Sequence, residues 1–213
     1  MGANFSRLLR GATRLNAQRR DRRLPPLLFV TDPARISDPL GLLRQLPRSA
    51  DGRLGVIFRH FGAPDRLATA RSLVKLCRKR RFILLIGADP ALAVKVRADG
   101  VHLPERMAAR AAGLKTRRPR WIVTGAAHTL KTLRHARGSD AILASPVFET
   151  QSAGAKGRKL LGPRGLSRFA HQATAPIYAL GGVNDRTIQK IQGVRGVLGA
   201  AVASGLSPLE HNK

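Results

Sequence analysis

Residues 71–105, RSLVKLCRKRRFILLIGADPALAVKVRADGVHLPE, contain two kinds of apolar pattern. Phe82–Ile86 is an unbroken apolar run, which is typical of a parallel strand buried on both faces. The segment before it places Leu, Val and Ala at helical spacing among Arg and Lys, which predicts an amphipathic helix. A helix-compatible stretch and a second short run, in DGVHLPE, come next. This order is typical of an α/β protein.

The same alternation extends over most of the chain. Short apolar runs end in Gly, Asp, Thr or His, and helix-compatible stretches usually follow; the eight runs are PLLFVTD, LGVIFRHFG, FILLIGAD, DGVHLPE, WIVTGAAHT, DAILASPVFET, PIYALGGV and RGVLGAAVASG. Eight strands alternating with helices predict a compact (β/α)8 TIM barrel. A doubly wound open sheet is the competing topology. Few residues follow the last run, so we expect an eighth helix to be very short or to come from another segment.

The first 23 residues, MGANFSRLLRGATRLNAQRRDRR, form an Arg-rich extension with a short apolar stripe. We therefore divide the chain into a basic N-terminal arm, residues 1–23, and a barrel, residues 24–213. A targeting peptide or a nucleic-acid-binding arm would have a similar composition. We favour a flexible or packed extension, which could also supply the missing helix.

Composition limits the class of protein. The net charge of +27 comes from 39 basic residues against 12 acidic ones, and it raises nucleic acid as a partner. We do not favour that partner, because the arginines are scattered along the chain and aromatic residues, at 4%, offer few stacking surfaces. No run is long enough to span a membrane, and no secretory segment is present, so we expect a cytoplasmic protein. The single Cys77 is expected to be buried.

The active face of a (β/α)8 barrel lies at the C-terminal ends of its strands. Glycines and a serine end the last two predicted strands, where barrels commonly hold phosphate through backbone N–H groups: Gly181, Gly182, Ser204 and Gly205. His102 and His128 end the fourth and fifth strands, where histidine can act as an acid or a base. Arg59 ends the second strand and is a candidate anion ligand; the direction of His60 is uncertain.

We predict no metal site and no cofactor. Four carboxylates fall near strand ends: Asp32, Asp89, Glu105 and Glu149. They form no close pair of the kind that holds magnesium beside a phosphate, and no Cys/His cluster has zinc spacing.

Five motifs, DGVHLPE, GAAHT, SPVFET, YALGGV and VASGL, resemble in order those of the thiamine phosphate synthase/TenI family of small (β/α)8 barrels. The resemblance covers roughly Leu27 to Leu206. It implies that Gly181, Gly182, Ser204 and Gly205 hold a thiazole phosphate. It also implies one of two activities. Synthases join a pyrimidine pyrophosphate to the thiazole phosphate with magnesium, whereas TenI-like members isomerise a thiazole phosphate, with the histidine at the position of His128 as proton shuttle.

The chain departs from the synthase pattern in the pyrophosphate and magnesium half of the site. The pyrophosphate arginine is retained as Arg59, but the lysine two residues later is Phe61. The Asn-Asp pair of synthases falls on Gly87 and Ala88, and the second magnesium ligand falls near Met107.

Two further positions differ. The serine that precedes the strand-five histidine by two residues is Ala126. The loop motif Thr-x-Thr-Lys reads Thr150, Gln151, Ser152, Ala153, with Lys156, Arg158 and Lys159 close behind. We interpret this segment as a lid over the ligand, in which Thr150 and Ser152 contact it.

The sequence therefore predicts a metal-independent, TenI-like thiazole tautomerase with His128 as the catalytic residue. The predicted ligand contacts are Arg59, His102, Thr150, Ser152, Gly181, Gly182, Ser204 and Gly205. One alternative is a divergent thiamine phosphate synthase, a transferase in which Lys156, Arg158 or Arg59 replaces magnesium. A second alternative is a catalytically silent barrel that binds nucleic acid or another polyanion.

Overall fold

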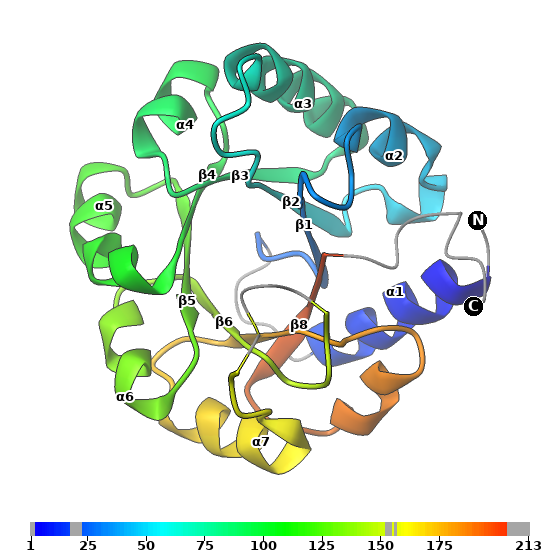
Figure 1. Cartoon of the computed structure of the whole chain (residues 1–213), viewed down its shortest axis with the longest axis vertical. Helices are drawn as coiled ribbons and strands as arrows, with labels where there is room; N and C mark the ends of the chain where they lie inside the picture. Colours follow the sequence, from blue (N-terminus) through cyan, green and yellow to red (C-terminus); the bar gives the residue numbers. More distant parts are fainter. Residues whose placement is uncertain (1–2, 18–22, 152–154, 156, 204–213) are drawn as a thin grey trace.

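The computed structural model describes residues 3–17, 23–151, 155 and 157–203. Eight parallel strands close into a barrel in the order β1-β2-β3-β4-β5-β6-β7-β8, with helices around the outside (Figure 1). The strands are β1 (Leu27–Val30), β2 (Leu54–Phe58), β3 (Ile83–Gly87), β4 (Gly100–Leu103), β5 (Ile122–Ala127), β6 (Ala141–Ala144), β7 (Ile177–Leu180) and β8 (Val197–Val202). The predicted (β/α)8 barrel is confirmed, and closure between β1 and β8 excludes the open sheet.

The helices between the strands differ greatly in length. The α-helices are α1 (Ala3–Asn16), α2 (Pro39–Gln45), α3 (Arg66–Arg80), α4 (Pro90–Val96), α5 (Ala111–Arg117), α6 (Leu130–Leu133) and α7 (Gly162–Gln172). Short 3-10 helices complete the ring: η1 (Arg48–Ala50), η2 (Glu105–Arg110), η3 (Arg134–Ala136) and η5 (Thr187–Ile191). The predicted helix in HTLKTLRHARG is a single α-turn, capped by Thr129, that continues into η3.

Both faces of the strands are buried, which explains their continuous apolar runs. A large cluster, which includes Phe29, Val56 and Ile86, lies between the strands and the helices. Alternate strand residues, among them Leu28, Ile57 and Leu85, form a second cluster that fills the barrel interior. Cys77 is fully buried on α3, and burial raises the pKa of its thiol to about 12.

The N-terminal extension supplies the helix that the end of the barrel lacks. Helix α1 packs against β8, β1 and η5 (Figure 1), with Phe5, Leu8 and Leu9 facing inward. The side-chain amide of Asn16 donates to the carbonyl oxygen of Leu198 at 3.1 Å. The apolar stripe of the extension therefore covers the seam between the last and first strands.

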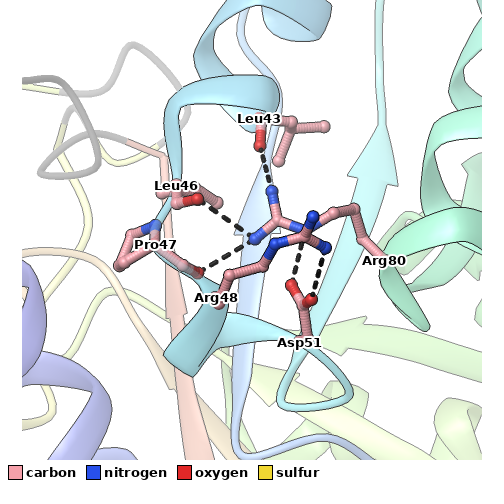
Figure 2. Close-up of polar contacts among 6 residues, drawn as sticks. All are labelled: Leu43, Leu46, Pro47, Arg48, Asp51 and Arg80. Carbon is pink, nitrogen blue, oxygen red and sulfur yellow. Dashed lines mark hydrogen bonds and ion pairs between the residues drawn. The ribbon is translucent and has the colours of Figure 1, made fainter.

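Arg80 joins three segments at the end of the barrel where the strands begin. Its guanidinium donates to the Asp51 carboxylate and to the carbonyl oxygens of Leu43, Leu46 and Pro47 (Figure 2). These three carbonyls lie in the last turn of α2 and directly after it, where backbone oxygens lack helical partners. The buried arginine thus connects α2 and η1 to the end of α3.

Candidate functional site

A cavity of about 390 Å³ opens at the C-terminal ends of the strands. Every strand end from β1 to β8 contributes to its wall, as a (β/α)8 barrel requires. Three arginines, Arg59, Arg106 and Arg158, line it together with Asp32 and Glu105. The cavity therefore suits a small anionic ligand.

His128 lies directly after β5 and lines this cavity. Its Nδ1 is 2.9 Å from the carbonyl oxygen of Ser145 and 3.0 Å from the Ser145 hydroxyl. Because a carbonyl oxygen only accepts, Nδ1 carries the hydrogen. In the neutral ring, the lone pair then belongs to Nε2, for which the described residues provide no hydrogen-bond partner. Ser145 thus sets the tautomer in which Nε2 can take a proton.

Glu105 fixes the backbone beside this histidine. Its Oε2 accepts from the His128 backbone N–H at 2.9 Å and from the Thr132 hydroxyl at 2.6 Å. Burial raises the pKa of Glu105, but these two hydrogen bonds and the nearby charges of His128 and Arg158 outweigh it and lower the pKa. The ionised carboxylate therefore holds the strand-five loop in place.

His102 lies beside His128 but in a different environment. It pairs in register with Thr124 of β5, and its Nδ1 lies 3.0 Å from the Thr124 hydroxyl. Burial, followed by the positive charges of Arg59 and His128, lowers its pKa to about 3. His102 is neutral near pH 7, so it can hydrogen-bond a ligand but brings no charge to a phosphate.

The wall formed by β2 and β3 is aromatic and basic. Phe61 is 52% exposed and lies within 6.0 Å of the Arg59 guanidinium and 5.5 Å of the Arg66 guanidinium. Arg66 donates to Asp89 at 2.6 Å and to the carbonyl oxygen of Gly87 at 3.2 Å. Asp89 also caps α4 by accepting from the backbone N–H of Leu92. Its carboxylate is therefore already engaged.

The loop after β6 is fixed at its base against β7. The backbone N–H groups of Val147 and Phe148 donate to the carbonyl oxygens of Leu180 and Gly181, both at 2.9 Å. Gly181 and Gly182 have φ of +89° and +65°, which favours glycine. A Cβ on Gly182 would also collide with the carbonyl oxygen of Glu149. The contact between the two loops therefore requires glycine at both positions. The expected approach of a phosphate is a second, separate reason for glycine there.

These features can be compared with known proteins. The family whose description is Thiamine monophosphate synthase matches residues 27–206. The chain belongs to this family. A putative thiamine-phosphate synthase 2 of Aquifex aeolicus is 34% identical over 116 residues, 54% of this chain and 61% of that protein. A thiamine-phosphate synthase of Bacillus cereus is 30% identical over 187 residues, 81% of this chain and 80% of that protein.

Solved structures support the fold. Thiamine phosphate pyrophosphorylase from Pyrococcus furiosus superimposes with a TM-score of 0.70 at 23% identity, covering 87% of this chain and 88% of that one. FabK from Thermotoga maritima superimposes with a TM-score of 0.64 at 14% identity, covering 85% and 58%. At these identities, the likeness concerns the barrel alone. None of the helices in the described ranges has the length and apolar character needed to cross a membrane.

The structure brings most of the predicted site residues of this family member together. Arg59, His102, His128, Thr150 and Gly181 all line the cavity. Gly182 lies next to Gly181 and packs against Phe148, Glu149 and the loop after β6. Ser152, Ser204, Gly205 and Lys156 lie outside the described residues.

Other positions were left open or not identified by the sequence. His60 is buried and stacks on Phe58, with ring centroids 5.2 Å apart, rather than facing the cavity. The roles of Ser145 and Thr124 were missed. Ser145 directly follows the buried run AILA, and this position at a strand end is the signal that could have identified it. Thr124 is a polar residue inside an apolar strand, which is a comparable signal.

The residues in the described part of the chain do not fit the magnesium ion that synthases of this family use. Of the two positions that match its ligands, one is Ala88 and the other falls near Met107; neither Ala88 nor Met107 offers a carboxylate. The carboxylates nearest to them are already bound, Asp89 by Arg66 and Glu105 by Thr132. The described residues also contain no cluster of three potential metal-ligating side chains.

Proposed function

We propose that this family member binds a thiazole phosphate and catalyses its tautomerisation without a metal ion. The observation that carries the proposal is the orientation of His128, whose Nδ1–H is held by Ser145 while its ring faces the cavity. A tautomerisation removes a proton from one ligand atom and returns it to another, and no group is transferred. One base that alternates between two protonation states is sufficient for that step.

The second histidine supports a single-base mechanism. His102 remains neutral down to a pH of about 3, so it does not exchange protons with the ligand near neutral pH. His128 accepts the proton at Nε2 while Nδ1–H stays on the Ser145 carbonyl oxygen. Ser145 and Glu105 are positioning residues, because one holds the ring and the other holds the backbone.

Phosphate binding is proposed beside β7 and β8. Gly181 lines the cavity there, and the guanidinium of Arg158 lies in the wall contributed by the loop after β6. Arginine forks and backbone N–H groups are common phosphate ligands in barrels. By the family resemblance, Ser204 and Gly205 complete this site.

The alternative within the family is a synthase that couples the thiazole phosphate to a pyrimidine pyrophosphate. The relatives named as thiamine-phosphate synthases and the three cavity arginines favour it. Without a metal, those arginines would have to stabilise the leaving pyrophosphate. Formation of a coupled product in the presence of a chelator would support this alternative over the tautomerase.

The proposal is tested by comparing His128→Gln with His135→Gln. His135 is an exposed histidine on η3 that does not line the cavity, so it serves as the matched control. We expect His128→Gln to reduce turnover of the thiazole phosphate at least about 100-fold, the usual contribution of a general base. Thermal stabilisation by the ligand should persist in both variants, with or without magnesium. Equal turnover in the two variants would remove His128 from the mechanism.

A further inference from the structure

A group of basic residues lies at the end of the barrel opposite the cavity. Helices α3, α4 and α5 end there, with basic residues in the last turn of each helix and in the segment before the next strand. Eight of these are exposed, and together we name them the basic arc: Arg78, Lys79, Arg81, Lys95, Arg97, Arg117, Arg118 and Arg120. The arc therefore lies on three successive β/α units of the barrel.

Hydrogen bonds show that these three helix ends are neighbours. The backbone N–H of Asp99 donates to Leu84 O at 3.0 Å, and that of Ile122 donates to Asp99 O at 3.0 Å. The guanidinium of Arg78 donates to the carbonyl oxygen of Arg97 at 3.2 Å. Figure 1 shows α3, α4 and α5 in sequence along one side of the barrel. The arc is thus a continuous surface rather than separate charges.

Acidic residues do not neutralise the arc. Within the described ranges, none of its eight side chains lies within ion-pair distance of a carboxylate. The one carboxylate between these helix ends, Asp99, accepts from the backbone N–H of Leu84 at 2.7 Å, and its charge interacts with that of Arg78. Elsewhere at this end of the barrel, Asp51 pairs with Arg80, and Asp140 pairs with Lys115. Most of the charge of the arc is therefore available to a partner.

Two positions of the arc carry arginine where the backbone favours glycine. Arg81 and Arg97 terminate α3 and α4 in the left-handed conformation, with φ of 52° and 57°. Glycine adopts this conformation without a Cβ penalty and is the usual residue there. Cations that interact with the helix ends are already present in the last turns, such as Lys79 and Lys95. Helix termination alone does not explain the two arginines.

We propose that the basic arc binds the phosphate backbone of double-stranded nucleic acid. Neighbouring helices lie about 10 Å apart, so three helix ends span roughly 20 Å. A duplex presents one charge per about 1.7 Å of its axis, and the arginine fork matches phosphate oxygens. This function is separate from the cavity, which opens at the other end of the barrel.

The composition of the arc favours a duplex over other polyanions. Bases of a single strand would need exposed aromatic rings for stacking. Trp121 is the aromatic residue nearest to the arc that is not buried, and the Arg118 guanidinium already covers it at 5.7 Å. An anionic membrane attracts basic residues too, but firm binding also uses an apolar face that inserts between lipids. The arc itself consists only of arginine and lysine.

The test uses substitutions that the backbone favours. Arg81→Gly/Arg97→Gly removes two charges and places glycine at both left-handed positions, so the double variant should melt at or above the wild-type temperature. Arg164→Ala/Arg168→Ala removes the same charge from exposed positions on α7 and serves as the matched control. Binding to a 24-base-pair DNA duplex (about two helical turns) is measured by fluorescence anisotropy at several salt concentrations.

We expect the arc variant to lose about tenfold in affinity and the salt slope to fall by about 1.8, the value for two lost phosphate contacts. The α7 variant should stay within about twofold of wild type, and turnover of the thiazole phosphate should be unchanged in both. Equal losses in the two variants would overturn the proposal, because binding would then follow net charge alone. It would also be overturned if vesicles containing phosphatidylserine bound the arc but the duplex did not.

Discussion

His102 and His128 show how burial assigns different roles to the same residue type. Both line one cavity, yet His102 is buried against Thr124 while His128 is half-buried with Nδ1–H on a backbone carbonyl. Burial makes the charged form of His102 unfavourable, so its ring stays neutral. The neutral ring also avoids a second positive charge beside His128 and Arg59. The two residues can therefore divide ligand contact and proton transfer between them.

The low pKa of His102 predicts a pH dependence of stability. Between its ordinary value of 6.5 and the folded value of about 3, the unfolded chain binds a proton that the folded protein does not. The stability contributed by this group is therefore fully present above pH 6.5 and is lost progressively as the pH is lowered toward 3. Burial also lowers the pKa of His60, which adds to the loss in the same direction.

Urea unfolding of wild type and His102→Asn between pH 7 and pH 4 measures this effect. Asn retains a group that can hydrogen-bond Thr124 but does not titrate. We expect a clearly shallower loss of unfolding free energy in the variant. If both proteins lose stability in parallel over this range, His102 is not the group responsible.

Gly182 and Gly62 allow the strand-seven loop contact to be measured. Both have positive φ, +65° and +74°, but only Gly182 has neighbours that a Cβ would meet. Gly62→Ala should cost about 1 kcal/mol for the backbone conformation alone. Gly182→Ala should cost at least about 1 kcal/mol more, because Glu149 and Phe148 would have to move. Chemical unfolding of both variants gives the difference. Equal costs would contradict a tight contact between the two loops.

At the level of elements, the helix that completes the outer ring of the barrel comes from the N-terminal end of the chain and does not follow β8. Helix α1 precedes β1 but covers β8, so the last strand is shielded by the first helix (Figure 1). Its buried face includes Leu8 and Leu9, each 2% exposed. An apolar strand face left open at this seam would favour aggregation. The N-terminal extension is thus part of the folded structure.

Arg80 and Arg48 contact the same carboxylate with different burial (Figure 2). The side chain of Arg80 is 7% exposed, whereas that of Arg48 is 80% exposed. Arg80→Met should reduce the free energy of unfolding by about 3 kcal/mol, because three carbonyl oxygens would lose their donor and Asp51 would keep only the exposed Arg48. Arg48→Met should cost no more than about 0.5 kcal/mol. Thermal unfolding of the pair decides this, and similar losses would show that burial does not control the contact.

At the level of the whole molecule, the sequence predicts the barrel because its signal is repeated eight times. Each run, such as FILLIGAD, is apolar on both faces, and the positions of His102 and His128 at strand ends follow directly from the run boundaries. The resemblance also predicted the family correctly. The arrangement of the cavity wall therefore follows from the order of the strands.

Contacts between residues distant in sequence could not be predicted in this way. The pairing of Ser145 with His128, of Glu105 with Thr132 and of Arg66 with Asp89 depends on how the loops fold over the strand ends. The charge of the basic arc looked scattered along the sequence for the same reason. Helices α3, α4 and α5 are separated by strands in the chain, yet closure of the barrel places their ends side by side.

The proposed activity is proton transfer at a thiazole phosphate without a metal ion. The most direct measurement is NMR of the wild-type reaction in D2O with an excess of EDTA. We expect conversion of the thiazole phosphate tautomer, with deuterium from solvent appearing at the carbon that receives the proton. Conversion that occurs only after magnesium is restored, or no conversion while the pyrimidine pyrophosphate is coupled, would contradict the account and favour the synthase.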